Sequence, residues 1–398
     1  ELRWYSSRAK REHPIRHPDR WRRLAPANTT TEYVGSRRLG RDFGAANTPQ
    51  GSHPRSRETV LKLLVVIVNY RTAEMTPDAI APALTELRSY PDARITIVDN
   101  ASGDGSVDRI ESGIAAKSWA DRVSLIRSSR NGGFASGCNQ AIRPALAGDD
   151  APDYVYLLNS DAFPDAGAID RLVDYLETHA DVGLAGSYIH GTDAARTPHK
   201  TAFRFPSLLG EIEGALGIGG VTRLLERWVI APALPEETTP VDWLAGASMP
   251  IRREVFDSIG LMDEGYFLYF EETDFCLQAA RNGWPTTYVV ESSVAHVGSA
   301  STGMQDVSSP TPTYWYASRH RYFTKNHGRA ALWAANLIYI VCGTIRRART
   351  TLMQRPSHEP RGHMRGFLRY NLLPWLRGSA HPNPPSHPIK QTQNVEKN

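Results

Sequence analysis

The sequence of residues 154–161, YVYLLNSD, predicts a buried β-strand that runs into a short acidic turn. Its first five residues are β-prone and apolar, which is typical of a central parallel strand covered on both faces. The polar residues Asn159, Ser160 and Asp161 follow. Because ligands of open α/β sheets bind beyond the carboxyl ends of the strands, we expect Asp161 to handle a metal or a phosphate. The alternative is that Asp161 caps a helix starting near Pro164.

Three earlier apolar runs, at 61–68, 95–98 and 123–126, also predict strands, and polar residues follow the first two directly. Helical spacing lies between them at 79–87, and a small-residue turn at 131–139 leads into a further helix. Alternating strands and helices predict an α/β fold with a mostly parallel sheet.

The chain beyond residue 161 continues this pattern less regularly. A helix is predicted at 166–176 and a strand at 182–187. Residues 190–240 hold many Gly and Pro residues, and we expect them to be irregular.

No classical phosphate-binding loop is present in this part of the sequence. There is no G-x-x-x-x-G-K-[ST] motif, and residues 131–137 do not match G-x-G-x-x-G. A bound nucleotide would therefore be held by side chains at several strand ends and by a metal.

An acidic cluster follows the aromatic and apolar segment 266–270. Glu271, Glu272 and Asp274 stand close together there. Carboxylates at this spacing repel one another unless a cation, a substrate or a proton is shared, which favours a functional site. Downstream, an apolar segment leads to His296, which has either a functional role or the role of a hydrogen-bonded core histidine.

Charge is distributed unevenly along the 398 residues. Residues 1–59 hold 13 Lys and Arg against 6 Asp and Glu, and residues 343–398 hold 10 against 2, so the intervening core is acidic. Basic flanks bind nucleic acid or anionic lipid, or are plain solvated tails. Because the core shows no nucleic-acid motif, we expect a lipid surface and no nucleic acid.

Cysteine usage and the N-terminus both bear on the compartment. Cys138, Cys276 and Cys342 show neither metal spacing nor a paired framework, which favours a reducing, cytoplasmic environment. The N-terminus has no apolar core of the kind a signal peptide needs, so we do not expect export.

Taken together, these segments resemble the family 2 inverting glycosyltransferases of GT-A fold, and within them the bacterial rhamnosyltransferase-like group. The resemblance covers about residues 62–305. It rests on VVIVNY, ITIVDNASGDGS, NGGFASGCNQAI, YVYLLNSDAFP, the GASMPIRREVFDSIGLMDEGYFLYFEETDFCLQAARNGW segment and the His296 segment, in the family's order and spacing.

The resemblance implies a nucleotide-sugar site. Its base and ribose would be held by Asn69, Tyr70, Arg71, Asp99 and Asn100, and its diphosphate would lie along Asn131, Gly132, Gly133 and Asn139. Asn159, Ser160 and Asp161 occupy the D-x-D position, of which only the last Asp is present. Asp161 and His296 would bind Mg²⁺ or Mn²⁺, which completes its shell with phosphate oxygens and water.

The resemblance also implies the catalytic and acceptor residues. Glu272 is our choice for the base, with Glu271 and Asp274 organising the acceptor or the loop, although the family usually has Asp at the second acidic position. Trp243 and Gly246 would shape the sugar and acceptor pocket, and Trp243 is equally suited to the core.

The implied activity is metal-dependent, inverting transfer of a hexose to a lipid-linked or cell-envelope glycan. Our first choice of donor is dTDP-rhamnose, and UDP-hexose and UDP-galactofuranose are alternatives. Two other classes stay open: a sugar-phosphate nucleotidyltransferase, whose Gly-rich basic loop is missing from VVIVNYRTAEMT, and a non-catalytic glycan-binding protein.

We expect four parts in the chain: a basic, largely irregular extension at 1–59, the glycosyltransferase domain at 60–305, a helical segment at 306–345, and a basic, Pro-rich tail at 346–398. Within them, residues 330–342 form a 13-residue apolar stretch, too short to span a bilayer as a helix. This stretch either packs on the domain or lies at a membrane surface. We favour peripheral contact with the inner face of the plasma membrane, because acceptors of the family are often polyprenyl-linked.

Overall fold

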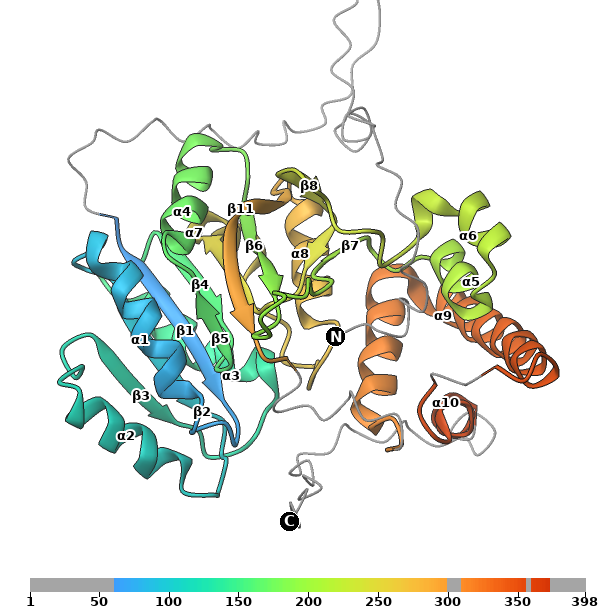
Figure 1. The fold of residues 1–398 in the computed structure, drawn as a ribbon, viewed down its shortest axis with the longest axis horizontal. Helices are drawn as coiled ribbons and strands as arrows, with labels where there is room; N and C mark the ends of the chain where they lie inside the picture. Colours follow the sequence, from blue (N-terminus) through green and yellow to red (C-terminus); the bar gives the residue numbers. More distant parts are fainter. Residues whose placement is uncertain (1–60, 299–308, 356–358, 373–398) are drawn as a thin grey trace, which may run out of the picture.

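The computed structural model describes residues 61–298, 309–355 and 359–372. A nine-stranded mixed sheet forms its centre, in the order β3-β2-β1-β4-β10-β6-β11-β5 with β8 paired to β11 (Figure 1). Its strands are β1 (Leu63–Asn69), β2 (Arg94–Asp99), β3 (Val123–Arg127), β4 (Tyr154–Leu158), β5 (Ala162–Pro164), β6 (Leu184–His190), β8 (Thr239–Val241), β10 (Ser248–Arg252) and β11 (Thr286–His296). A separate two-stranded sheet pairs β7 (Ala202–Phe203) with β9 (Trp243–Leu244).

The helices are α1 (Thr76–Glu86), α2 (Ser106–Ala116), α3 (Phe134–Ala147), α4 (Ala168–Thr178), α5 (Leu208–Leu216), α6 (Gly219–Leu224), α7 (Arg253–Ile259), α8 (Glu271–Arg281), α9 (Thr313–Leu352) and α10 (His363–Asn371), with short 3₁₀ turns η3 (Leu87–Ser89) and η4 (Glu226–Trp228). The predicted α/β fold is confirmed, and the four apolar runs predicted as strands correspond to β1 to β4.

The strands β1, β2, β3 and β4 run parallel, so their carboxyl ends meet at one edge of the sheet. In the register, Val65 lies opposite Ile95 on one side and Tyr156 on the other. All five residues of β4 are buried, as its continuous apolar sequence predicts. Beyond β4 the antiparallel strand β10 makes the sheet mixed.

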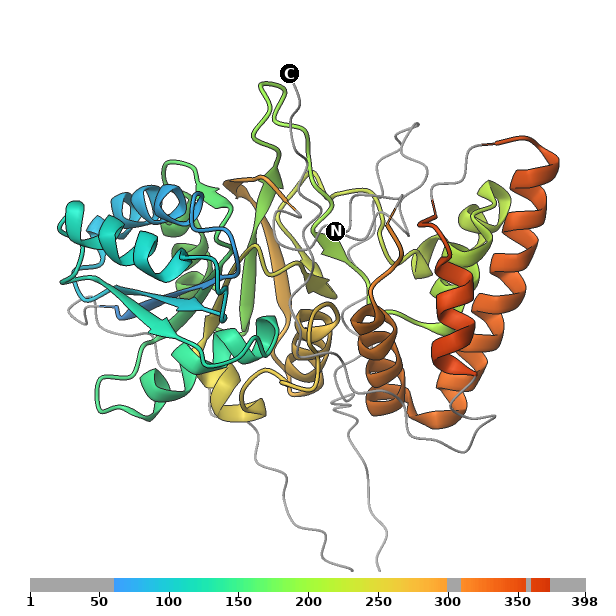
Figure 2. The ribbon, with the colours of Figure 1, turned by 90° about the horizontal axis from the view of Figure 1, so that it is seen from below.

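Two apolar cores cover the two faces of the sheet. One core packs α1, α2 and α4 against it, and the other packs α3, α7 and α8 (Figures 1 and 2). A third, aromatic core joins the segment before α8 to α9 and α10.

The helices α5, α6, α9 and α10 form a helical lobe beside the sheet (Figures 1 and 2). Gly328 divides α9, because its φ of 85° and ψ of 168° interrupt the helical backbone. Arg319 in the first half is fully buried and donates hydrogen bonds to Glu211 Oε2 of α5 at 2.7 Å and to Asn336 Oδ1 of the second half at 2.7 Å. This buried network fixes both halves of α9 to the lobe.

The structure corrects three expectations about the less regular parts of the chain. Residues 190–240, expected to be irregular, contain α5, capped by the Ser207 hydroxyl at Gly210 N, as well as α6 and β7. The local sequence does not indicate α5, because Arg319, the partner of its buried Glu211, lies 108 residues further along the chain.

The range 346–398 is likewise not a tail throughout, because α9 extends to Leu352 and the buried side chains of α10 pack on it. The division into four parts otherwise stays a prediction.

The third corrected expectation is that the apolar stretch 330–342 is too short to span a bilayer as a helix. This stretch is part of the second half of α9, which is much longer than the stretch itself. Within the described ranges, α9 is the one helix whose length and composition would allow it to cross a membrane, with a mean hydropathy of 1.3 over 18 residues, of which 22% are buried.

Candidate active site

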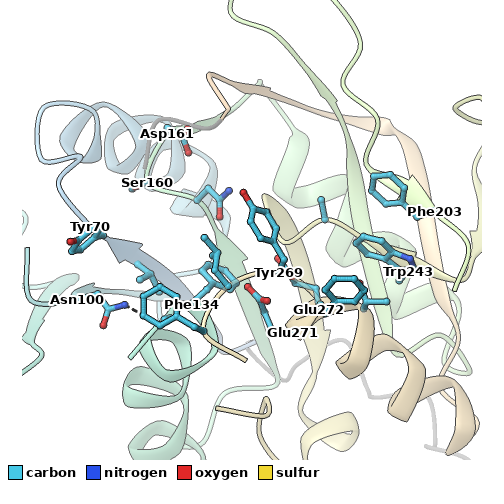
Figure 3. A pocket seen from close by; sticks show the side chains of 18 of the residues that line it. Tyr70, Asn100, Phe134, Ser160, Asp161, Phe203, Trp243, Tyr269, Glu271 and Glu272 are labelled. Carbon is cyan, nitrogen blue, oxygen red and sulfur yellow. Dashed lines mark hydrogen bonds between the residues drawn. The ribbon is translucent and has the colours of Figure 1, made fainter. Parts of the chain in front are cut away.

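A pocket opens at the carboxyl ends of the parallel strands and extends to the start of α8 (Figure 3). Its empty volume is about 1250 Å³, including space open to solvent. The predicted site residues that line it are Tyr70, Asn100, Asn131, Gly133, Asn159, Ser160, Asp161, Trp243, Glu271, Glu272 and His296. The structure thus brings together side chains from seven separate segments of the sequence.

Asp161 and His296 form a buried pair on one wall of this pocket. His296 is the last residue of β11 and lies opposite Ala162 of β5, so the pairing of these two strands places His296 beside Asp161. The His296 Nε2 lies 3.1 Å from Asp161 Oδ1, and the Gly298 N–H donates to Asp161 Oδ2 at 3.1 Å. The capping alternative for Asp161 is wrong, because β5 follows it directly and Gly167 caps α4.

The pKa of Asp161 lies below its usual range. Burial alone would raise this pKa, but the hydrogen bond and the charge of His296, together with the backbone N–H groups, outweigh burial. The carboxylate is therefore present as the anion at neutral pH, which is the form that binds a cation.

The side chains of Asp161 and His296 have the chemistry to bind a divalent cation. The Asp161 carboxylate and the His296 imidazole, whose Oδ1 and Nε2 lie 3.1 Å apart, are both groups that bind metal ions. No group of three or more His, Cys, Asp or Glu side chains within the described part of the chain is arranged to hold a metal. The remaining ligands would thus be water and substrate oxygens.

Asn159 and Ser160 support this wall. The Asn159 Nδ2 lies 3.3 Å from His296 Nε2, and the Ser160 hydroxyl lies 2.8 Å from the Thr72 hydroxyl. Both side chains therefore connect the end of β4 to neighbouring segments while lining the pocket.

The acidic wall starts from a strained piece of backbone. Tyr269 and Phe270 both have positive φ, 70° and 69°, although neither is glycine. Such conformations cost about 1–3 kcal/mol each and cluster at functional sites. Here they turn the aromatic segment into the first turn of α8, where Glu271 and Glu272 lie close to the positive end of the helix dipole.

Glu272 approaches the backbone closely at Gly246. The Gly246 N–H donates to Glu272 Oε1 at 3.3 Å, and a Cβ on Gly246 would lie 2.8 Å from the same oxygen. Trp243 lines the pocket next to it, stacks on Phe203 at 4.3 Å, and donates its indole N–H to Arg204 O. Trp243 is thus part of the core and of the pocket wall at once.

Asp274 is not part of the pocket, and the expectation of an acidic trio is corrected. Its carboxylate is buried and accepts hydrogen bonds from Lys325 Nζ at 2.6 Å and from Asn326 Nδ2 at 2.7 Å. The cation that relieves the repulsion of Asp274 is therefore Lys325 of α9.

Asn100 holds the glycine-containing turn before α3 in place. Its amide donates to Asn131 Oδ1 and to Gly133 O, both at 3.0 Å, and its Oδ1 accepts from Gly132 N. Gly133 has a φ of 88°, and a Cβ there would lie 1.9 Å from Phe267 O. Only glycine allows the segment before α8 to pass this close to the turn.

Asn139 does not take the position expected for a diphosphate ligand. It is buried in α3, and its amide donates to Met262 O at 2.8 Å and to Glu264 Oε1 at 3.0 Å. The expectation for Asn139 is therefore corrected: its side chain fastens α3 to the segment that precedes α8.

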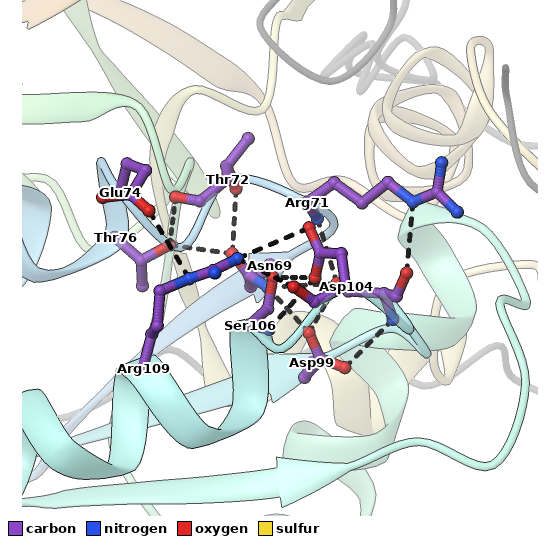
Figure 4. Close-up of polar contacts among 10 residues, drawn as sticks. Asn69, Arg71, Thr72, Glu74, Thr76, Asp99, Asp104, Ser106 and Arg109 are labelled. Carbon is purple, nitrogen blue, oxygen red and sulfur yellow. Dashed lines mark hydrogen bonds and ion pairs between the residues drawn. The ribbon is translucent and has the colours of Figure 1, made fainter. Parts of the chain in front are cut away.

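Asn69, Arg71 and Asp99 form a polar network beside the pocket and are not among its lining residues (Figure 4). The buried Asp99 accepts hydrogen bonds from Asn69 Nδ2 at 2.7 Å and from the hydroxyl of Ser102 at 2.6 Å. Arg71, at a φ of 57°, donates through Nε to Ser102 O. The network shapes the strand ends that carry Tyr70 and Asn100, both of which do line the pocket.

Several aromatic side chains that the sequence motifs do not indicate also line the pocket. Phe134, Phe203, Phe267 and Tyr269 all line the pocket, and in the view of Figure 3 Tyr269 lies near its middle. The aromatic run directly before Glu271 was a visible signal for two of them. Phe203 could not be found in this way, because only the pairing of β7 with β9 brings it to the site.

Comparisons with known proteins agree with this arrangement. Residues 64–226 match the model of the family Glycosyl transferase family 2. The chain is 28% identical, over 270 residues, to the N-acetylglucosaminyl-diphospho-decaprenol L-rhamnosyltransferase of Mycobacterium tuberculosis (strain ATCC 25618 / H37Rv), covering 66% of this chain and 84% of that protein.

Two further proteins are more distantly similar. The low-salt glycan biosynthesis hexosyltransferase Agl10 of Haloferax volcanii is 26% identical over 230 residues, covering 55% of this chain and 62% of that protein. The solved structure of the mannosyltransferase PcManGT from Pyrobaculum calidifontis, in complex with GDP-Man and Mn²⁺, aligns with a TM-score of 0.45 at 15% identity, covering 73% of this chain and 74% of that one.

The family model and the rhamnosyltransferase relative confirm the predicted resemblance to family 2, and they support neither the nucleotidyltransferase nor the non-catalytic alternative. The chain contains a glycosyl transferase family 2 domain, matched over residues 64–226, and it is a glycosyltransferase.

Proposed function

We propose that this protein is a metal-dependent, inverting glycosyltransferase that moves a sugar from a nucleoside diphosphate to a lipid-linked or cell-envelope glycan. The supporting observation is the pocket that Asp161 and His296 line together with Glu271 and Glu272. A cation-binding pair and a pair of carboxylates in one cavity match the two needs of the reaction: charge for the leaving diphosphate and a base for the acceptor.

Asp161 and His296 would hold Mg²⁺ or Mn²⁺, which when bound supplies positive charge to the departing diphosphate. Glu272 removes the proton of the acceptor hydroxyl while that oxygen bonds to the anomeric carbon. The bond from this carbon to the diphosphate breaks in the same step, and the nucleoside diphosphate leaves with the electron pair. The configuration at the carbon inverts because the two oxygens occupy opposite sides.

The chain's own residues position this displacement. The Gly246 N–H holds the Glu272 carboxylate, and the strained backbone at Tyr269 and Phe270 fixes the start of α8. Tyr70, Asn100 and the turn at Asn131 and Gly133 line the part of the pocket proposed for the nucleotide. Aromatic side chains such as Trp243 offer flat apolar faces to a sugar ring.

For the donor we propose dTDP-rhamnose, supported by the 28% identity to an L-rhamnosyltransferase. UDP-hexose and UDP-galactofuranose are the alternatives. The same relative carries diphospho-decaprenol in its name, which supports a polyprenyl-linked acceptor and contact of the basic flanks with the inner face of the plasma membrane.

The test is turnover by purified Asp161→Asn and Glu272→Gln variants with each candidate donor and Mn²⁺. We expect the turnover of Glu272→Gln to be roughly 10²–10⁴-fold lower than that of wild type, because that is the usual contribution of a positioned general base. The exposed Glu237→Gln is the matched control and retains full turnover. Near-normal turnover in both site variants would defeat the assignment of roles.

A further inference from the structure

The second half of α9 carries a row of exposed apolar side chains on the side away from the rest of the lobe. Trp333, Leu337, Val341 and Ile345 are 38%, 63%, 48% and 47% exposed, and Leu352 beyond them is 86% exposed. Residues four apart in a helix lie nearly above one another, so these side chains form one continuous stripe, here called the outer face.

The opposite side of this helix is already packed. Leu332, Ala335, Asn336 and Cys342 are buried against α5 and α10, which lie on either side of α9 (Figure 1). Among the residues that the structure describes, the lobe therefore leaves the outer face uncovered. A stripe of this kind on a soluble domain marks a surface that meets a partner.

The charged side chains of the second half of α9 are all arginines, and one of them, Arg347, is paired with Glu359. From Gly328 to Arg355 the sequence contains five arginines and neither Asp nor Glu. Arg329 and Arg355 are exposed at the two ends of the helix. Arg346 and Arg349 instead donate hydrogen bonds to the last carbonyls of α5, at Gly214 O and Leu216 O, and fix the helix in place.

A helix with a Trp and branched apolar side chains on one face, and with arginines but no acidic residues in its own sequence, has the composition of helices that lie in the surface of an anionic membrane. Crossing the membrane is a poorer fit. The inner side of the helix carries Asn336, hydrogen-bonded to the buried Arg319, and it would have to leave α5 and α10 to enter lipid.

We propose that the outer face of α9 docks on an anionic lipid bilayer, with the helix lying in the plane of the membrane surface. The choice of a bilayer as partner rests on the proposed function, in which the acceptor is lipid-linked. The surface itself is assigned by the exposed residues of α9 and by the charges at its ends.

The experiment measures co-sedimentation of the full chain with vesicles of phosphatidylglycerol and phosphatidylcholine in equal parts, and with vesicles of phosphatidylcholine alone. The test variant is Leu337→Glu with Val341→Glu, which changes two exposed positions. The control is Leu224→Glu with Ala116→Glu, which adds the same charge at exposed positions on α6 and α2.

Wild type and control should bind the anionic vesicles, and the test variant should bind them about tenfold more weakly or worse, because two apolar side chains no longer enter the lipid. Binding to the uncharged vesicles should be weaker than binding to the anionic ones, and high salt should weaken binding to the anionic vesicles. Equal binding by wild type and the test variant, or resistance of wild type to alkaline carbonate extraction, would overturn the proposal.

A second copy of the chain is the competing partner for this face. It would appear as a wild-type dimer in light scattering that becomes a monomer in the test variant, without vesicle binding by either, and this outcome also overturns the proposal. Thermal stabilisation by dTDP with Mn²⁺ is measured on the same samples. If it is lost while vesicle binding persists, the proposed function fails and the docking surface stands.

Discussion

Close contacts at single residues determine how the acidic wall of the pocket is built. Glu272 lies against Gly246, and Phe267 O lies against Gly133, each at a distance that leaves no room for a Cβ. The two glycines differ in one respect. Gly133 needs its positive φ, whereas Gly246 has an ordinary backbone, so a side chain at Gly246 acts on Glu272 alone.

We predict that Gly246→Ala lowers kcat by roughly tenfold to a hundredfold with little change in stability. The new methyl group would lie 2.8 Å from Glu272 Oε1, so the flexible carboxylate moves, and small displacements of a catalytic group have effects of about this size. Steady-state kinetics and urea unfolding measure both quantities. Gly220→Ala, where a Cβ meets nothing within 4 Å, is the control, and an unchanged kcat in Gly246→Ala would show that Glu272 is not the base.

The sequence indicates which residues come together where a motif lies directly at a strand end. Asp161 and His296 were named from the sequence, and the structure places them 3.1 Å apart. Asn139 and Asp274 stand in equally recognisable motifs, yet their side chains bind Glu264 and Lys325. A motif indicates which side chains stand near a site, but the direction of each side chain depends on the neighbours it meets after folding.

Among the secondary-structure elements, α10 depends on a buried histidine for its attachment to α9. His363 begins α10, and its ring nitrogens lie 2.7 Å from the Thr311 hydroxyl and 2.6 Å from the Tyr339 hydroxyl. Burial, with smaller effects from the charges of Arg347 and Arg319, lowers the pKa of His363 from 6.5 to about 3. The ring is therefore neutral in the folded protein.

We predict that the docking of α10 weakens as the pH falls below 6.5. Below pH 6.5 His363 is protonated in the unfolded chain, whereas in the folded protein it stays neutral until about pH 3. The stability that depends on the neutral ring is therefore present above pH 6.5 and is lost as the pH falls from 6.5 to about 3. One pH unit below 6.5 the loss is about 1.4 kcal/mol. Hydrogen exchange at the α10 amides, corrected for intrinsic rates, should show it.

The matched variant is His363→Gln, which keeps a hydrogen-bonding side chain but does not titrate. It should be less stable at pH 7 and should lose the added pH dependence between pH 7 and 5. If wild type and variant show the same pH profile, then His363 does not control the docking of α10.

For the whole molecule, the sheet and the helical lobe contribute to one pocket through the aromatic core. Tyr269 of the pocket stacks near Tyr314 of α9, at 6.1 Å between ring centroids, and Lys325 of α9 binds Asp274 of α8. Occupation of the pocket should therefore stabilise both parts together, since a ligand that binds the native state alone raises its apparent stability.

We predict that a nucleoside diphosphate with Mn²⁺ raises the free energy of unfolding by about 2.7 kcal/mol at a ligand concentration of 100 Kd. Thermal-shift measurements with dTDP, UDP and GDP would rank the bases. The metal-dependent part of the shift should disappear in Asp161→Asn, and the exposed Glu237→Gln should retain it. A shift that is independent of Mn²⁺ in wild type would contradict the proposed metal pair.

The sequence by itself determined the α/β class, the strands β1 to β4, the resemblance to family 2 and most of the polar residues proposed for the site. It could do so because a buried parallel strand is a continuous apolar run and because the ends of such strands meet at one edge. Only the tertiary structure decided which polar groups face the cavity, that Phe203 reaches it, and that α9 leaves an apolar face uncovered. Each of these depends on contacts between residues far apart in the chain, such as Glu211 with Arg319, and no local pattern contains them.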